Sequence, residues 1–160
     1  MYDSRNDLSP ATRSRVIETL NARLADAIDL GTQAKYAHWN VKGPNFIALH
    51  ELFDQVAATL ENQIDTLAER ITALGGTAYG TLASVAKATS LKPYPEGISD
   101  GMLHVDALSA ALADFGAKVR KEIDQTAHLG DADTADVFTE ISRATDKNLW
   151  FLEAHLAGKR

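Results

Sequence analysis

Apolar residues recur at helical spacing through almost the whole chain, and turn residues separate the runs. The first run follows Ser9-Pro10, an N-cap with proline at the first helical position, and ends before Gly43-Pro44. The second ends at Gly75-Gly76 and the third at Gly130, since glycine often terminates a helix. No alternation typical of strands occurs. The pattern predicts long helices over residues 10–39, 45–74, 100–129 and 131–157.

Four helices of matched length indicate an all-α four-helix bundle, a single domain over residues 1–160 with 1–9 as a short tail. Each helix of about 27–30 residues would be roughly 40–45 Å long. The long connection, residues 75–99, can span the bundle, so the second and third helices could run parallel. Its middle, residues 82–89, is mildly helical, and Lys92-Pro93-Tyr94-Pro95 then ends that helix. We expect a crossover that carries a short helix.

Composition and charge narrow the chemistry. The chain of 160 residues and 17.3 kDa has no cysteine, which excludes disulfides, thiolate zinc sites and iron–sulfur clusters. It begins without an apolar signal segment and has no apolar run near the ~18 residues of a membrane span, so we expect a cytoplasmic protein with no membrane partner. Sixteen basic against 22 acidic residues give a net charge of −6, which suits cations better than nucleic acid.

The second helix carries a stripe of metal-ligand residues. His50 and Asp54 are four residues apart, as are Asp65 and Glu69, so each pair shares a helical face. Counting about 100° per residue from His50, the other three lie near 40°, 60° and 100°, beside the apolar stripe and not within it. A solvated acidic face would look the same. Small residues on this face favour an interface instead, because they admit a second helix: Ala57, Ala58 and Ala68.

The two pairs are about 16 Å apart along the helix axis, too far to hold one ion. A two-fold axis near Thr59-Leu60 would place His50 and Asp54 of one subunit against Asp65 and Glu69 of another. Imidazole and carboxylate ligands suit iron(II), manganese or zinc. A di-iron site inside the bundle would need Glu-x-x-His motifs, and the sequence has none. His38 reads as a core histidine, and three others as structural or surface residues: His104, His128 and His155.

Four longer segments carry a family resemblance. Residues 38–46, His-Trp-Asn-Val-Lys-Gly-Pro-Asn-Phe, are followed by Leu-His-Glu-Leu-Phe-Asp at 49–54, Asp-Thr-Leu-Ala-Glu-Arg at 65–70 and Asp-Lys-Asn-Leu-Trp-Phe at 146–151. The chain resembles the Dps mini-ferritins (DNA-binding proteins from starved cells) over about residues 8–157. The order His, His, Asp, Asp, Glu at spacings of 12, 4, 11 and 4 makes the match specific.

The resemblance implies a ferritin-like bundle that assembles into a hollow dodecamer, with a ferroxidase site at each two-fold interface. Its ligands would be His38, His50 and Asp54 of one subunit with Asp65 and Glu69 of the other, which moves His38 from the core to the metal. Trp39 would lie beside the site, to intercept oxidising equivalents or only to pack. The implied activity is oxidation of iron(II), with hydrogen peroxide as the preferred oxidant, and storage of ferric oxide as protection against oxidative damage.

Acids at the start of the fourth helix could complement the helix dipole, which would account for Asp131 and Asp133. In the family this segment lines a three-fold pore, so the resemblance implies Asp131, Asp136 and Glu140 as pore residues for iron.

The sequence departs from the family pattern for DNA binding, which uses a lysine-rich tail. The segment before Ser9 has a net charge of −1, and the C-terminus offers only Lys159 and Arg160, so intrinsic DNA binding is disfavoured and nucleoid association depends on it. Two other classes stay open: a DNA-coating protein with secondary metal sites, and a structural oligomer without chemistry.

Overall fold

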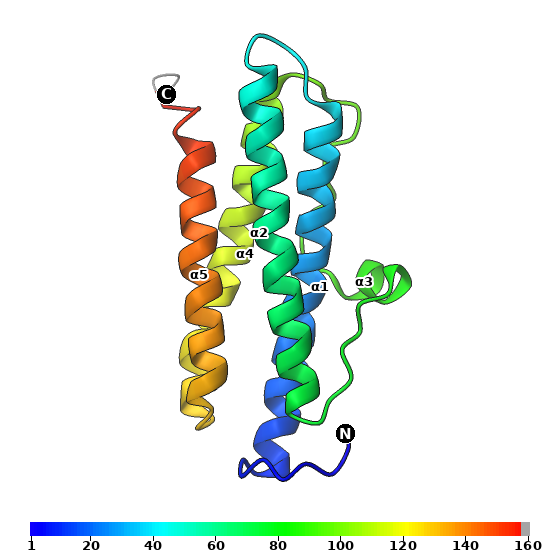
Figure 1. The fold of residues 1–160 in the computed structure, drawn as a ribbon, viewed down its shortest axis with the longest axis vertical. Helices are drawn as coiled ribbons and strands as arrows, with labels where there is room; N and C mark the ends of the chain where they lie inside the picture. The colour runs from blue at the N-terminus through cyan, green and yellow to red at the C-terminus, as the bar shows by residue number, and fades with distance from the viewer. Residues whose placement is uncertain (158–160) are drawn as a thin grey trace.

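The computed structural model describes residues 1–157, which form five helices and one isolated bridge between Lys42 and Asp100. The helices are α1 (Pro10–Asn40), α2 (Phe46–Ala73), α3 (Leu82–Ala88), α4 (Gly101–His128) and α5 (Ala132–Glu153). Four of them form an all-α bundle, and α3 stands beside α1, outside the bundle (Figure 1). None of the described helices combines the length and apolar character needed to cross a membrane.

The connection between α2 and α4 runs the full length of the bundle. It leaves the end of the bundle near the N-terminus, passes α3 at mid-height and enters α4 at the opposite end (Figure 1). The helices α2 and α4 therefore run parallel, and α1 and α5 run in the other direction (Figure 1). The long crossover with a short helix, expected from the sequence, is confirmed.

Local side chains define the helix ends. The Ser9 hydroxyl accepts a hydrogen bond from the Thr12 amide at 3.1 Å, and Asp100 accepts from the amides of Met102 and Leu103. Each bond satisfies an amide of the first turn that has no partner within the helix. Gly130 has a φ of 83°, a left-handed conformation that favours glycine, between α4 and α5. The bounds of α1, α2 and α4 lie within one residue of the predicted ranges.

The last helix is shorter than predicted. The sequence pattern extended it to residue 157, whereas α5 ends at Glu153. Beyond that residue the His155 amide donates to the Leu152 carbonyl and the Leu156 amide to the Glu153 carbonyl, so the chain tightens into turns. Leu152 is the last fully buried side chain of this segment. Leu156 packs against the core only partly buried, and this contact with the apolar spacing does not maintain the helix.

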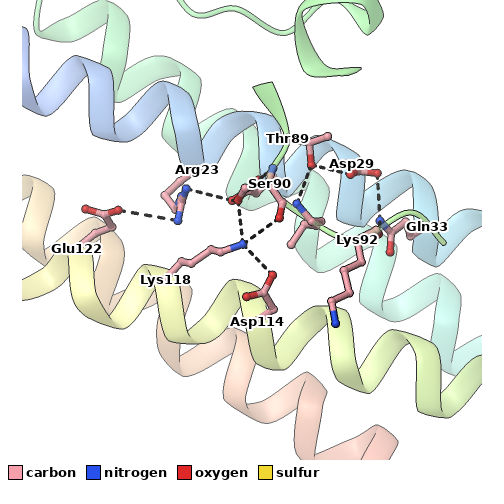
Figure 2. A network of polar contacts seen from close by, with 11 residues as sticks. Arg23, Asp29, Gln33, Thr89, Ser90, Lys92, Asp114, Lys118 and Glu122 are labelled. Carbon is pink, nitrogen blue, oxygen red and sulfur yellow. Dashed lines mark hydrogen bonds and ion pairs between the residues drawn. The ribbon is translucent and has the colours of Figure 1, made fainter. Parts of the chain in front are cut away.

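A buried polar network fixes the path of the crossover. Asp26 on α1 is fully buried and accepts hydrogen bonds from the Ser90 amide at 2.7 Å and hydroxyl at 3.0 Å. The Arg23 guanidinium lies 3.1 Å from the same carboxylate. From α4, the Lys118 ammonium donates to the Ser90 hydroxyl at 2.8 Å and to Asp114 at 2.7 Å (Figure 2). The crossover is thus bonded to both α1 and α4.

Removing the buried carboxylate should destabilise the fold. We expect Asp26→Ala to lower the free energy of unfolding by about 3 kcal/mol, because Arg23 would stay buried without its nearest anion. Asp114→Ala is the matched control, since Asp114 belongs to the same network but is exposed, and we expect a loss within about 1 kcal/mol. Urea-induced unfolding followed by circular dichroism measures both variants. Equal losses would contradict the role given to Asp26.

Candidate metal centre

Two of the predicted ligands lie against each other where α1 ends and α2 begins. The rings of His38 and His50 stack with centroids 3.7 Å apart and planes 21° apart. The Nδ1 atom of His38 lies 2.7 Å from the His50 carbonyl oxygen, and Nδ1 of His50 lies 2.8 Å from the His38 carbonyl oxygen. The tight connection through Gly43, with a φ of 111°, allows the two helices to meet in this way.

These reciprocal hydrogen bonds determine which ring nitrogens are free. A carbonyl oxygen only accepts, so each Nδ1 must carry the proton and donate it. In the neutral rings the lone pair is then on Nε2 of His38 and on Nε2 of His50. A histidine that ligates a metal through one nitrogen commonly donates its other N–H to a carbonyl or carboxylate. The pair is therefore preorganised to present two imidazole ligands.

The third predicted ligand, Asp54, forms an ion pair with Lys35 of α1. Its side chain is 51% exposed. The hydrogen bond and the positive charge of Lys35 outweigh the opposing effect of desolvation and hold the pKa of the Asp54 carboxyl below its usual value. Asp54 is thus an anion at neutral pH whose present counterion is an ammonium group.

The remaining predicted ligands, Asp65 and Glu69, lie further along α2 and are exposed. The eleven residues from Asp54 to Asp65 correspond to about 16 Å along the helix axis. Within residues 1–157, no three His, Asp or Glu side chains are arranged to hold one metal ion. The structure brings His38, His50 and Asp54 to one end of α2 and leaves Asp65 and Glu69 apart from them.

The surroundings of the ligands are open to a partner. Trp39, next to His38, has 69% of its surface exposed. Ala58 is exposed and Ala68 is partly exposed, as a contact face would require. Ala57 is an exception: the sequence analysis placed it on the ligand face, but it is 6% exposed and packs in the core. Its angular position borders the apolar stripe, and the core includes it.

The three acids predicted to line a pore differ in their environments. Asp131 is 2% exposed and caps α5, accepting from the Thr134 amide at 3.0 Å and from its hydroxyl at 2.6 Å. It also pairs with Arg70 of α2 at 2.7 Å. Asp136 and Glu140 are exposed on α5. Asp131 thus stabilises the joint between α2 and α5, and the two others are open to solvent in the chain.

Sequence reasoning missed Lys35 at the site and the hydrogen-bond partner of His104. Lys35 precedes His38 by three residues on the same helix, and that spacing was a usable signal. His104, interpreted as structural or surface, is fully buried, and its Nδ1 lies 2.8 Å from the Tyr94 hydroxyl. No sequence signal links Tyr94 to His104, because Tyr94 belongs to an irregular segment.

The sequence is similar to proteins of one known family. The sequence profile of the ferritin-like domain matches residues 17–160. The DNA protection during starvation protein of Agrobacterium fabrum is 48% identical over 158 residues, 99% of this chain and 98% of the relative. The chain belongs to the Dps family of ferritin-like proteins.

Solved Dps structures have the same fold. DpsC from Streptomyces coelicolor matches with a TM-score of 0.94 and 30% identity, over 98% of this chain and 91% of that one. Dps from Microbacterium arborescens in the high iron form matches with a TM-score of 0.87 and 35% identity, over 93% of this chain and 97% of that one. The fold expected from the sequence, and the membership of the Dps family, are confirmed.

Proposed function

We propose that the protein is a ferroxidase and iron-storage mini-ferritin, which oxidises iron(II) with hydrogen peroxide and stores ferric oxide within a hollow dodecamer. The observation that carries this proposal is the reciprocal bonding of His38 and His50, which leaves both Nε2 atoms free as ligands. Asp54 adds an anionic oxygen from the same subunit. Asp65 and Glu69 complete the site from a neighbour across a two-fold axis.

The donor set suits oxidation of its substrate. Carboxylate oxygens stabilise iron(III) more than iron(II), because a hard trication gains more from anionic ligands. Lys35 pairs with Asp54 until an iron ion replaces the ammonium group. Two iron(II) ions give two electrons to one peroxide molecule, which with two protons yields two water molecules and no hydroxyl radical. Trp39 lies beside the ligands, where it packs or intercepts stray oxidising equivalents.

Iron needs a path into the shell, and the exposed acids of α5 support one. Asp136 and Glu140 are four residues apart on one helical face and are open to solvent. We propose that they line a pore at a three-fold axis. Asp131 borders the pore. It caps α5 and binds Arg70, so it fixes the position of the start of α5 at the pore.

The direct test is iron oxidation in solution. Iron(II) added to the protein without oxygen should stay iron(II), and addition of hydrogen peroxide should produce the ferric absorbance faster than in protein-free buffer. Size measurement before and after loading should show an iron-filled assembly of unchanged diameter. Ferric formation no faster than in buffer would contradict the proposed function and favour a structural oligomer.

Duplex DNA should not bind at near-physiological salt and pH 7. Counterion release needs several lysine or arginine contacts per subunit, whereas the segment before Ser9 has a net charge of −1 and each subunit one of −6. Lys159 and Arg160, the basic residues of the C-terminus, lie outside the described residues. A gel mobility-shift assay over a salt series measures binding. A clear shift at that salt would refute the prediction, and truncation of those two residues would then locate the contact.

A further inference from the structure

A cluster of aromatic rings lies in the bundle between the crossover and the ligand-bearing ends of α1 and α2. Its centre is His104 of α4, which is 0% exposed. The ring centroids of Tyr94, Phe53 and Tyr36 lie 6.0, 6.1 and 6.5 Å from that of His104. Tyr36 and Tyr94 also meet edge to face at 5.4 Å. The proposed metal site uses none of these rings.

One hydrogen bond in the cluster joins a phenol to a base. The Tyr94 hydroxyl lies 2.8 Å from Nδ1 of His104. Burial lowers the pKa of His104, only partly offset by the Ile98 carbonyl and Asp100, so the ring is neutral near pH 7. Burial also raises the pKa of Tyr94, so its hydroxyl keeps its proton. In the tautomer that carries its proton on Nε2, Nδ1 of His104 accepts this bond and the Tyr94 hydroxyl donates it.

The cluster includes rings from both helices that carry the proposed ligands. Phe53, fully buried, immediately precedes Asp54 on α2, and Tyr36 is two residues before His38 on α1. Tyr94 also lines a groove of about 650 Å³ between the crossover and α4, together with Pro93, Pro95 and Leu103. The hydrogen-bonded pair thus lies among rings from both ligand-bearing helices and borders an open groove.

We propose that Tyr94 is a one-electron donor to oxidants formed at the iron site, with His104 as the acceptor of its proton. This proposal rests on the proposed function and deepens it. A phenol loses an electron readily only if its proton has somewhere to go, and Nδ1 of His104 is within hydrogen-bond distance. If the pair were only structural, the bond would satisfy the hydrogen-bonding capacity of Nδ1 in a buried imidazole, and Tyr94 would not be oxidised.

Tyr94 would donate its electron when a peroxide molecule meets a single iron(II) ion, because two iron(II) ions are needed to supply both electrons. Peroxide takes two electrons; iron(II) supplies one and becomes iron(III), and Tyr94 supplies the other and becomes a neutral phenoxyl radical. The Tyr94 O–H bond breaks, its proton forms an N–H bond on His104, and the O–O bond of peroxide breaks to leave two hydroxide ions. A small reductant in the groove can then return the electron, and His104 returns the proton.

Electron paramagnetic resonance of freeze-quenched samples tests the proposal. Protein holding less than one iron(II) per site is mixed with peroxide, with ring-deuterated tyrosine to distinguish tyrosyl from tryptophanyl signals. We expect a tyrosyl radical with a proton coupling that disappears in D2O, because the phenoxyl oxygen accepts a hydrogen bond from protonated His104. Tyr94→Phe should lose this signal, and Tyr79→Phe, which changes an exposed tyrosine outside the cluster, should keep it.

A second arm omits iron, so that failure of the proposed function stays distinguishable. Iron-free protein is oxidised by a photogenerated ruthenium(III) polypyridyl complex, and the same D2O-sensitive signal is measured. Its absence, or its survival in Tyr94→Phe, overturns the assignment of Tyr94 as a donor. The signal in this arm alone, while peroxide still produces the ferric absorbance, overturns the link to the iron site. No ferric absorbance at all contradicts the ferroxidase proposal instead, and the iron-free arm still decides whether Tyr94 donates.

Discussion

Asp65→Ala and Glu69→Ala should each slow iron oxidation by about 100-fold or more, since even loss of an outer-sphere partner commonly costs a metal site 10- to 100-fold. Each change removes one of the carboxylates proposed to stabilise iron(III). Both side chains are exposed in the chain, so their removal leaves no cavity in the core. The initial rate of ferric absorbance after peroxide addition measures the effect.

The control for this prediction is Asp106→Ala. Asp106 is an exposed aspartate on α4, away from the ligand stripe of α2, so its removal changes net charge equally without touching the proposed site. We expect its rate to equal that of the unmodified protein. Size-exclusion chromatography should show the same assembly for all three variants, because apolar packing also holds the interface. A normal rate in either ligand variant would remove that residue from the site.

Mixed assemblies should recover activity that neither parent has. One variant carries His50→Ala and Asp54→Ala, and the other carries Asp65→Ala and Glu69→Ala. Alone, each lacks two of the five proposed ligands at every site and should be inactive. In a mixed dimer one site combines both damaged halves, and the other combines both intact halves. Because random pairing makes half of the dimers mixed, co-assembled protein should recover about a quarter of the unmodified rate.

Two affinity tags, one on each variant, verify that purified shells contain both chains. A mixture of shells that were each assembled from one variant alone serves as the control and should stay inactive. A site within one chain would give no rescue, since every chain would still lack two of the five proposed ligands. Failure of rescue in verified mixed shells would overturn the two-fold arrangement, whereas the single variants above would still report on each ligand.

The sequence by itself determined the helices and their approximate ends. Apolar spacing, the cap at Ser9 and the glycines at Gly75 and Gly130 act within a few residues, so they can be read along the chain. The length of the connection only allowed α2 and α4 to run parallel, and the structure shows that they do (Figure 1). The ligand candidates were also readable, since spacings of four residues define one helical face.

Only the tertiary structure decided contacts between segments far apart in the chain. The stacking of His38 on His50, and with it the free Nε2 of each ring, depends on how closely α1 and α2 meet. The burial of Asp131 depends on Arg70, which reaches it from the far end of another helix. Tyr94 finds His104 because buried Asp26 holds Ser90 and sets the path of the irregular crossover. Local spacing carries no information on such contacts, since they depend on which helix faces the core shares and on which polar groups must be paired when buried.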